Sequence, residues 1–265
     1  MGGIILSIFG GLFNYTKEGP GVSKDAPQKK RFFYFFELYF RKFWKLCLLN
    51  LIYLMACIPV VTIGPATAGA TYVLRNFARE EHAYVWYHFW KAFKSNFKQS
   101  FIMGIINLIV YGLSGWVILF YVMNIGTNDY FIVLLAIAII FVIVYSVFNY
   151  YTYLLMVTVN LSFKAIIKNS YIFTVLGIKY NFCVFLFSTI IVALEALFFP
   201  LTLPVVLFIG VSTPMFISVF GVYPVVKKYC IDPILAAEAE AEEEDEESVF
   251  SDKLLITDDT SDDED

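Results

Sequence analysis

Long uninterrupted apolar runs constrain this chain more than any other feature. Residues 131–148, "FIVLLAIAIIFVIVYSVF", contain no charge and no regular alternation of apolar and polar positions. About 18 such residues make a helix that crosses the roughly 30 Å hydrocarbon core of a bilayer, whereas a barrel strand alternates. Lipid offers backbone groups no hydrogen-bond partner, so a continuous run must be helical. The sequence therefore predicts an all-α protein, a polytopic transmembrane helix bundle.

Five apolar segments are long enough to be predicted as spans. The composition agrees, because 59% of the 265 residues are hydrophobic and only 16% are charged, which is atypical of a soluble domain. The predicted spans are residues 46–63, 100–124, 130–152, 181–199 and 203–222.

The distribution of Lys and Arg assigns the two sides of the membrane. No basic residue separates the second span from the third or the fourth from the fifth, so both loops are predicted outside. Basic clusters occupy the other connections and both flanks of the bundle. We therefore expect a multi-pass cell-membrane protein with cytoplasmic termini. Tyrosines at 145, 150, 151 and 153 are predicted to form an inner aromatic belt.

The Pro- and Gly-containing stretch after the first span resolves a conflict in this topology. Both flanks of that span are basic, and a single crossing cannot place both inside. We expect the chain to turn so that residues 66–77, about 18 Å of helix, return as a short re-entrant or sixth span. An ordinary surface loop is the alternative. The predicted turn residues are Pro59, Thr62, Gly64, Pro65 and Thr67.

Two aromatic and basic segments are predicted as amphipathic helices in the cytoplasmic interface. Residues 32–45 carry Glu37, Arg41 and Lys45 at four-residue steps as a polar face. In the second segment, aromatic rings recur at helical spacing beside a lysine cluster, which suits contact with membrane lipids. Docking to a partner protein is the alternative. The interfacial or docking residues are Trp86, Phe89, Trp90, Lys91, Phe93, Lys94 and Lys98.

The charge of the chain divides it into three predicted parts. Residues 1–45 are a cytoplasmic segment with the first amphipathic helix, 46–228 form the bundle, and 229–265 are an acidic tail. Of the 23 acidic residues, 15 lie in 238–265, which leaves 8 acids against 18 bases elsewhere. A like-charged block with few apolar residues is predicted to be disordered, and its sign argues against nucleic acid as a partner.

Three polar residues inside predicted spans are candidate functional positions. Asn50 and Asn107 are expected to join helices rather than bind substrate. Glu195 is an acid at membrane depth near the outer end of its span. It is expected to have a structural or interfacial role, with a proton or cation site as the alternative.

The sequence offers no group suited to catalysis. His82 and His88 are six positions apart and do not share a helical face, so a metal site is not expected. We find no nucleotide loop, metalloprotease helix or nucleophile elbow. The prediction is that the chain is not an enzyme and needs no cofactor.

The region from residue 19 to 100 resembles the YesL-like bacterial integral membrane proteins, whose domain is of unknown function. The likeness rests on "GPGVSKDAPQKKRFFYFFELYFRKFWKLCLLNLIYLMACIPVVTIGPATAGATYVLRNFAREE" and "FWKAFKSNFKQS". Its marks are Asn50, the turn at 59–68 and the "NFKQ" at 96–99; the acidic tail departs from the family. The resemblance implies association with carbohydrate uptake, especially ABC importers.

These observations lead to two functional expectations. The first is an accessory membrane subunit of a bacterial oligosaccharide ABC importer, which docks to the permease, the ATPase or both. The alternative is a stand-alone channel or transporter of small solutes, with a site near the "TIGPAT" turn and Glu195.

Overall fold

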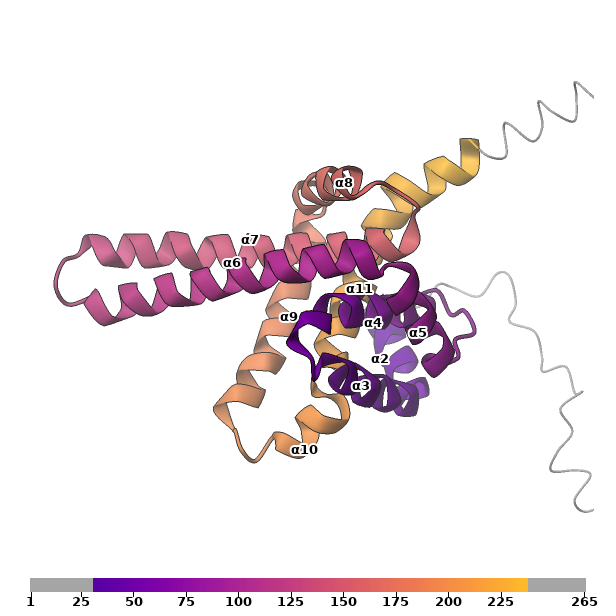
Figure 1. Cartoon of the computed structure of the whole chain (residues 1–265), viewed down its shortest axis with the longest axis horizontal. Helices are drawn as coiled ribbons and strands as arrows, with labels where there is room; N and C mark the ends of the chain where they lie inside the picture. Colours follow the sequence, from indigo (N-terminus) through magenta and orange to yellow (C-terminus); the bar gives the residue numbers. More distant parts are fainter. Residues whose placement is uncertain (1–30, 238–265) are drawn as a thin grey trace, which may run out of the picture. The chain divides into compact units, whose positions relative to one another are not determined.

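The computed structural model describes residues 31–237, and every regular element among them is a helix (Figure 1). Of the predicted disordered tail, residues 229–265, the part from 238 onward lies outside the described residues, and residues 229–237 are helical. The chain divides into two compact units after Glu37, and the description below concerns the unit that begins at Leu38. The elements are α2 (Arg31–Arg41), α3 (Phe43–Cys57), η1 (Val60–Thr62), α4 (Ile63–Ala78), α5 (Val85–Ser95), α6 (Phe97–Asn124), α7 (Tyr130–Thr158), α8 (Phe163–Leu176), α9 (Ile178–Leu197), α10 (Leu203–Val205), η2 (Val206–Gly210), α11 (Ser212–Val226) and η3 (Lys227–Ile231).

Among the described residues, α6, α7 and α9 are long and apolar enough to cross a membrane. A fourth span is present if the bent pair Leu203–Gly210 and Ser212–Ala237 counts as one crossing. The prediction of a helical protein with several membrane spans is confirmed, but the five predicted spans are not. Helix α3 has 15 residues and ends at Cys57, because Pro59 has no N–H and disfavours helix before it.

The short helix α4 is the centre of the bundle rather than a marginal segment. It packs against α3, α5, α6, α7 and α11. Most of its side chains are buried, from Ala66 at its start to Phe77 at its end. Glycine and alanine recur along "IGPATAGATYVLRNFA", and small side chains let neighbouring helices approach on several sides.

The closest approach to α4 is at Gly64, where α6 crosses it. A Cβ placed on Gly64 would lie 2.9 Å from the Cα of Gly104 and would collide with the carbonyl oxygen of Ser100. Neither glycine can be enlarged without separating the two helices. The sequence feature predicted as a turn therefore also provides a helix crossing.

The chain reverses direction between α3 and α4. The Tyr53 hydroxyl lies 3.3 Å from the hydroxyl of Thr67, so α4 runs back alongside α3. At the turn, the Thr62 hydroxyl is 2.6 Å from the carbonyl oxygens of both Ala56 and Pro59. This hydroxyl satisfies carbonyl groups that the end of α3 leaves free.

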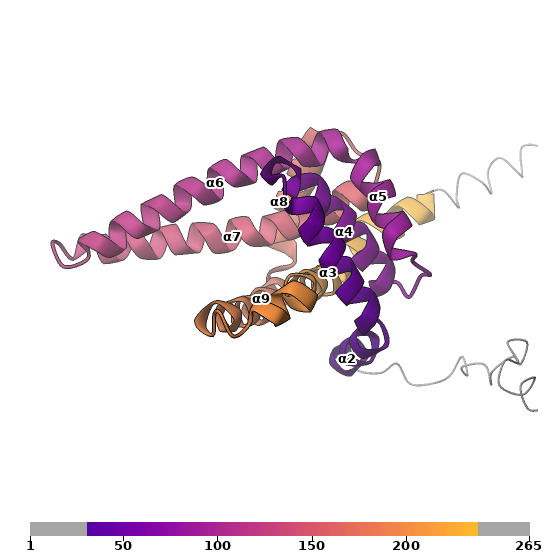
Figure 2. The ribbon, with the colours of Figure 1, turned by 60° about the horizontal axis from the view of Figure 1, so that its bottom comes forward.

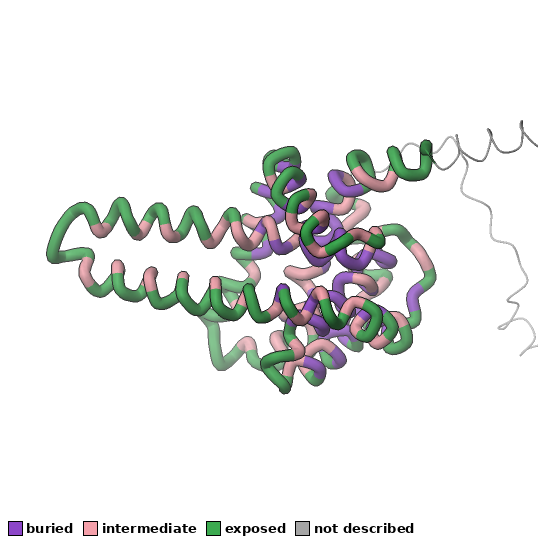
Figure 3. Tube along the Cα trace, turned by 45° about the horizontal axis from the view of Figure 1, so that its top comes forward, coloured by how far each residue is buried: buried purple, intermediate pink, exposed green. Residues whose placement is uncertain are grey.

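Helices α6 and α7 form a long antiparallel hairpin that extends from the bundle in both ribbon views (Figures 1 and 2). Most of its length is exposed or only partly buried (Figure 3). In each helix only 6% of the most apolar window is buried within the protein. An apolar surface of this extent needs lipid or another protein to cover it.

Candidate functional site

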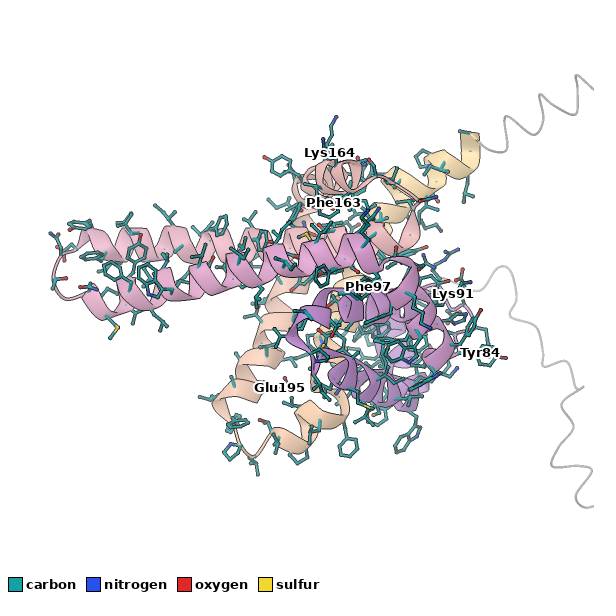
Figure 4. The ribbon with its side chains drawn as sticks, viewed as in Figure 1. Tyr84, Lys91, Phe97, Phe163, Lys164 and Glu195 are labelled. Carbon is teal, nitrogen blue, oxygen red and sulfur yellow. The ribbon has the colours of Figure 1, made fainter. Side chains whose placement is uncertain are left out.

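The residues predicted to be interfacial divide between the core and the surface. Phe89 is fully buried against α4, where a Cβ on Gly69 would lie 2.9 Å from the Phe89 carbonyl oxygen. Trp86 remains 60% exposed, and Lys91 is exposed on the outer side of α5 (Figure 4). Exposed Lys94 lies on α5, half-buried Trp90 and Phe93 also lie on α5, and exposed Lys98 lies on α6. Helix α5 is therefore a packed element of the bundle with one exposed aromatic and basic edge.

Asn50 joins α3 to the broken helix 156 to 162 positions later. Its Nδ2 donates to the carbonyl oxygens of Val206 and Leu207 at 2.9 and 2.8 Å. Its Oδ1 accepts from the amides of Val211 and Ser212 at 3.0 and 2.8 Å. The helix is irregular here, because the π-helical η2 precedes α11, and the fully buried carboxamide hydrogen-bonds four of its backbone groups.

Asn107 links the two helices of the hairpin. Its Nδ2 donates to the Tyr153 hydroxyl at 3.2 Å, and its Oδ1 accepts from the Tyr145 hydroxyl at 2.6 Å. The Tyr151 hydroxyl donates to Oδ1 of Asn181 at 2.7 Å. Tyr151 and Tyr153 are buried in protein rather than forming an aromatic belt at a lipid interface, because their hydroxyls find amide partners on neighbouring helices.

Glu195 lies on α9 facing the break in the last helix (Figure 4). A Cβ on Gly210 would lie 2.7 Å from Oε1 of Glu195, so the carboxyl group packs directly on that glycine. The Thr202 hydroxyl donates to the Glu195 carbonyl oxygen at 2.6 Å. The carboxyl group does not line the cavity described below, so the structure does not bring Glu195 and the "TIGPAT" turn into one site.

Arg75 is a buried cation, although the sequence pattern places it only among the basic residues expected on the cytoplasmic side before residue 100. It is 7% exposed, and its guanidinium donates to the Val157 carbonyl oxygen and to Oδ1 of Asn76. Its Cζ lies 4.4 Å from the centre of the Tyr72 ring. Val157 is in the last turn of α7, where carbonyl groups have no helical partner and favour a positive charge. In the sequence, the only sign of this burial is that Arg75 stands within the mainly apolar stretch "TYVLRNFA".

The two histidines both contact Tyr84, the residue that precedes α5. Nδ1 of His88 accepts a hydrogen bond from the Tyr84 amide at 3.1 Å, and the His82 ring packs edge-on against Tyr84. Among residues 31–237, no group of three or more His, Cys, Asp or Glu side chains is placed to hold a metal ion.

A cavity of about 780 Å³ lies where the hairpin meets α4, α9 and α11. In the part of the chain that the structure describes, no charged side chain lines it. Ile63 and Thr67 of the predicted turn contribute to one wall, and Asn107 contributes to another. Its polar lining residues are Tyr53, Thr67, Thr71, Asn107, Tyr111, Ser146, Asn149, Tyr150, Tyr153, Ser188, Thr189 and Ser218.

Residues 46–121, from α3 to near the end of α6, match the model of a family described as "Protein of unknown function, DUF624". The match covers 76 of the 265 residues of the chain. YesL-like proteins are members of this family, so the resemblance predicted from the sequence is confirmed. No curated protein and no solved structure matches the chain.

The DUF624 segment contains the central part of the site. It includes Asn50, the turn, α4 and the Gly64–Gly104 crossing. The remaining cavity walls come from α7, α9 and α11, beyond the matched residues. The cavity is therefore assembled from the DUF624 segment and from three later helices together.

Proposed function

We propose that this chain is an accessory integral membrane subunit of a bacterial oligosaccharide ABC importer, which docks to the permease, the ATPase or both. The observation that carries the proposal is the exposed α6–α7 hairpin, of which the apolar windows are only 6% buried. The YesL-like resemblance is what suggests the class of transporter.

One face of α6 is suited to contact with another helix in the membrane. This Gly112 face consists of Leu108, Gly112, Gly115, Trp116 and Leu119, which recur at helical spacing. A Cβ added at Gly112 or Gly115 would meet no atom within 4 Å, so these glycines are not needed for packing within this chain. Small residues on a membrane helix allow a partner helix to approach closely.

The cytoplasmic contacts are assigned to α5 and the segment before α3. Exposed Trp86, Lys91 and Lys94 supply aromatic and cationic groups that suit lipid headgroups or an acidic surface of an ATPase. Both segments then act as amphipathic helices in the inner interface, as the sequence predicted.

We also propose a membrane topology, which goes beyond the three or four candidate spans recognised by length and hydropathy. We assign five crossings, with α3 as a short first crossing, and α4 as a re-entrant or sixth span. Basic clusters then face the cytoplasm together with both termini. Because α4 is surrounded by protein, its polar groups need no contact with lipid.

Affinity purification tests the accessory role. The tagged chain, expressed at its native level and extracted in mild detergent, is expected to recover an ABC permease and ATPase identified by mass spectrometry. Recovery of no transporter subunit contradicts the proposal. The double variant Gly112→Leu, Gly115→Leu is expected to reduce recovery about tenfold, whereas exposed Ala136→Leu on α7 is the matched control.

A stand-alone channel or transporter is the second candidate, and the cavity beside the turn favours it. Ile63 and Thr67 line the cavity, although Glu195 does not. Purified protein in liposomes would then move a small neutral solute. Loss of flux in Glu195→Gln would assign the residue a part in transport, and absence of flux from the unmodified protein would exclude this candidate.

A further inference from the structure

Exposed lysines from four helices gather at the base of the α6–α7 hairpin. Nε2 of Gln99 donates to the Leu161 carbonyl oxygen at 3.3 Å, so the start of α6 lies against the connection between α7 and α8. Helix α11 packs against α7 and α8. In both ribbon views, α5, α8 and the end of the last helix lie away from the hairpin tip (Figures 1 and 2). This basic end of the bundle consists of Lys91, Lys94, Lys98, Lys164, Lys227 and Lys228.

The lysines of the basic end have no carboxylate partner among residues 31–237. All six are exposed, and none forms an ion pair with a described acid. The two glutamates between α4 and α5 are already paired, Glu80 with Arg41 and Glu81 with Arg79. Residues 31–237 carry 14 Lys and Arg side chains against 6 Asp and Glu. The excess positive charge repels itself, and an acidic segment bound there would relieve the repulsion.

The acids that the bundle lacks follow it in the sequence. Residues 238–247 contain eight acids in ten positions, and the next base is Lys253. This acidic run begins ten positions after Lys228, directly after the last described helical residue, Ala237. The helical residues from Lys228 to Ala237 extend for about 15 Å, whereas ten extended residues reach about 35 Å. The acidic run is therefore long enough to turn back to the basic end.

Attachment to the same chain favours this segment over free anions. A short flexible connection holds a segment at an effective concentration in the millimolar range. A single exposed ion pair contributes only about 0.2 to 1 kcal/mol, but several act together when six lysines face eight acids. The same lysines also suit anionic lipid headgroups, which are therefore the competing ligands.

We propose that residues 238–247 bind the basic end of their own chain and compete there with anionic lipid headgroups. The interaction surface is the group of six lysines, and its occupant is the acidic run. The contact depends on the charges of this chain alone. It requires neither docking to a transporter nor movement of a solute across the membrane.

Cross-linking of the full chain tests the contact. The chain is placed in phosphatidylcholine nanodiscs, one chain per disc, and a carbodiimide joins carboxylates to the lysine amines that they touch. Mass spectrometry is expected to find amide bonds between residues 238–247 and lysines of the basic end. Their yield should fall about fivefold between about 50 and about 500 mM salt, because salt screens exposed charges. Absence of these bonds, bonds mainly to lysines elsewhere, or a yield unchanged by salt overturns the proposal.

Two full-length variants test the competition with lipid. One replaces each acid of 242–247 by its amide, and the control does the same for the six acids of 258–265, so both remove equal charge and leave residues 31–237 unchanged. Native mass spectrometry counts the phosphatidylglycerol molecules that each chain retains from nanodiscs containing this lipid. The 242–247 variant is expected to retain about threefold more than the unmodified protein, and the control about as many as the unmodified protein. Equal retention by the two variants contradicts the proposal, because no particular part of the acidic segment would then occupy the lysines.

Discussion

Oδ1 of Asn50 accepts the amide of Ser212 at 2.8 Å, across 162 positions of sequence. Together with its bonds to Val206, Leu207 and Val211, this contact attaches α3 to the break between η2 and α11. A carboxamide is suited to this position because it both donates and accepts, and the break exposes carbonyl and amide groups together. The residue is structural, and its loss should destabilise two distant segments at once.

Asn50→Leu is expected to lower the free energy of unfolding by about 3 kcal/mol, because four buried backbone groups lose their partner. Thermal unfolding in detergent, followed by circular dichroism, measures the change. Asn124→Leu, which removes one bond near the tip of the hairpin, should lose far less. Equal melting temperatures of the two variants would refute the role given to Asn50.

Gly64→Ala is expected to destabilise the protein by about 2 kcal/mol. The added methyl group would lie 2.9 Å from the Cα of Gly104, and two helix backbones would have to separate. Gly115→Ala on α6 is the control, since its Cβ would meet nothing within 4 Å and alanine favours helix. The comparison of unfolding midpoints checks the prediction, which fails if the two substitutions have the same effect.

Arg75→Met is expected to cost about 2 to 3 kcal/mol, because the Val157 carbonyl oxygen and Oδ1 of Asn76 lose charged donors while buried. Arg75→Lys should lose less stability than Arg75→Met but should remain below the unmodified protein, since one ammonium group cannot reproduce the hydrogen bonds of the planar guanidinium group. Arg79→Met is the matched change. Its ion pair with Glu81 at 2.7 Å is partly exposed and contributes little. A milder effect of Arg75→Met than of Arg79→Met would disprove this account.

His88 is expected to make stability depend on pH. Burial, with Lys91 and His82 as further causes, lowers the pKa of His88 below its ordinary value of 6.5. The unfolded chain therefore binds the proton more readily, so the free energy of unfolding falls as pH drops below about 6.5 towards the folded-state pKa. Protonation of Nδ1 also removes the acceptor of the Tyr84 amide.

Unfolding midpoints between pH 7.5 and 5 measure this dependence. His88→Gln should flatten the contribution, because glutamine does not titrate. His82→Gln should retain most of the slope assigned to His88, because burial is the larger cause of the lowered pKa and His82 the smallest. A slope that survives unchanged in His88→Gln would assign the effect to other groups.

Local sequence patterns were sufficient for the type and position of most helices. The apolar runs predicted α6, α7 and α9, because a segment that must bury its backbone in lipid can be recognised without knowing its neighbours. Pro59 and Pro65 indicated a turn, since proline limits the backbone on both sides. The aromatic and basic pattern of residues 86–98 predicted a helix but not that Phe89 packs in the core. Helical periodicity shows which residues share one face of a helix, but it does not show which other part of the protein packs against that face.

The sequence by itself determined that this is a helical membrane protein, and it favoured a turn after the first apolar helix over a surface loop, because hydropathy and proline geometry act within a few neighbouring residues. Only the tertiary structure decided that α4 is the centre, that Asn50 holds the last helix, and that the hairpin, α4, α9 and α11 enclose a cavity without a charged lining among the described residues. Those facts depend on contacts between segments up to 162 positions apart, and small residues, amides and hydroxyls acquire their roles only from the partners that packing brings to them.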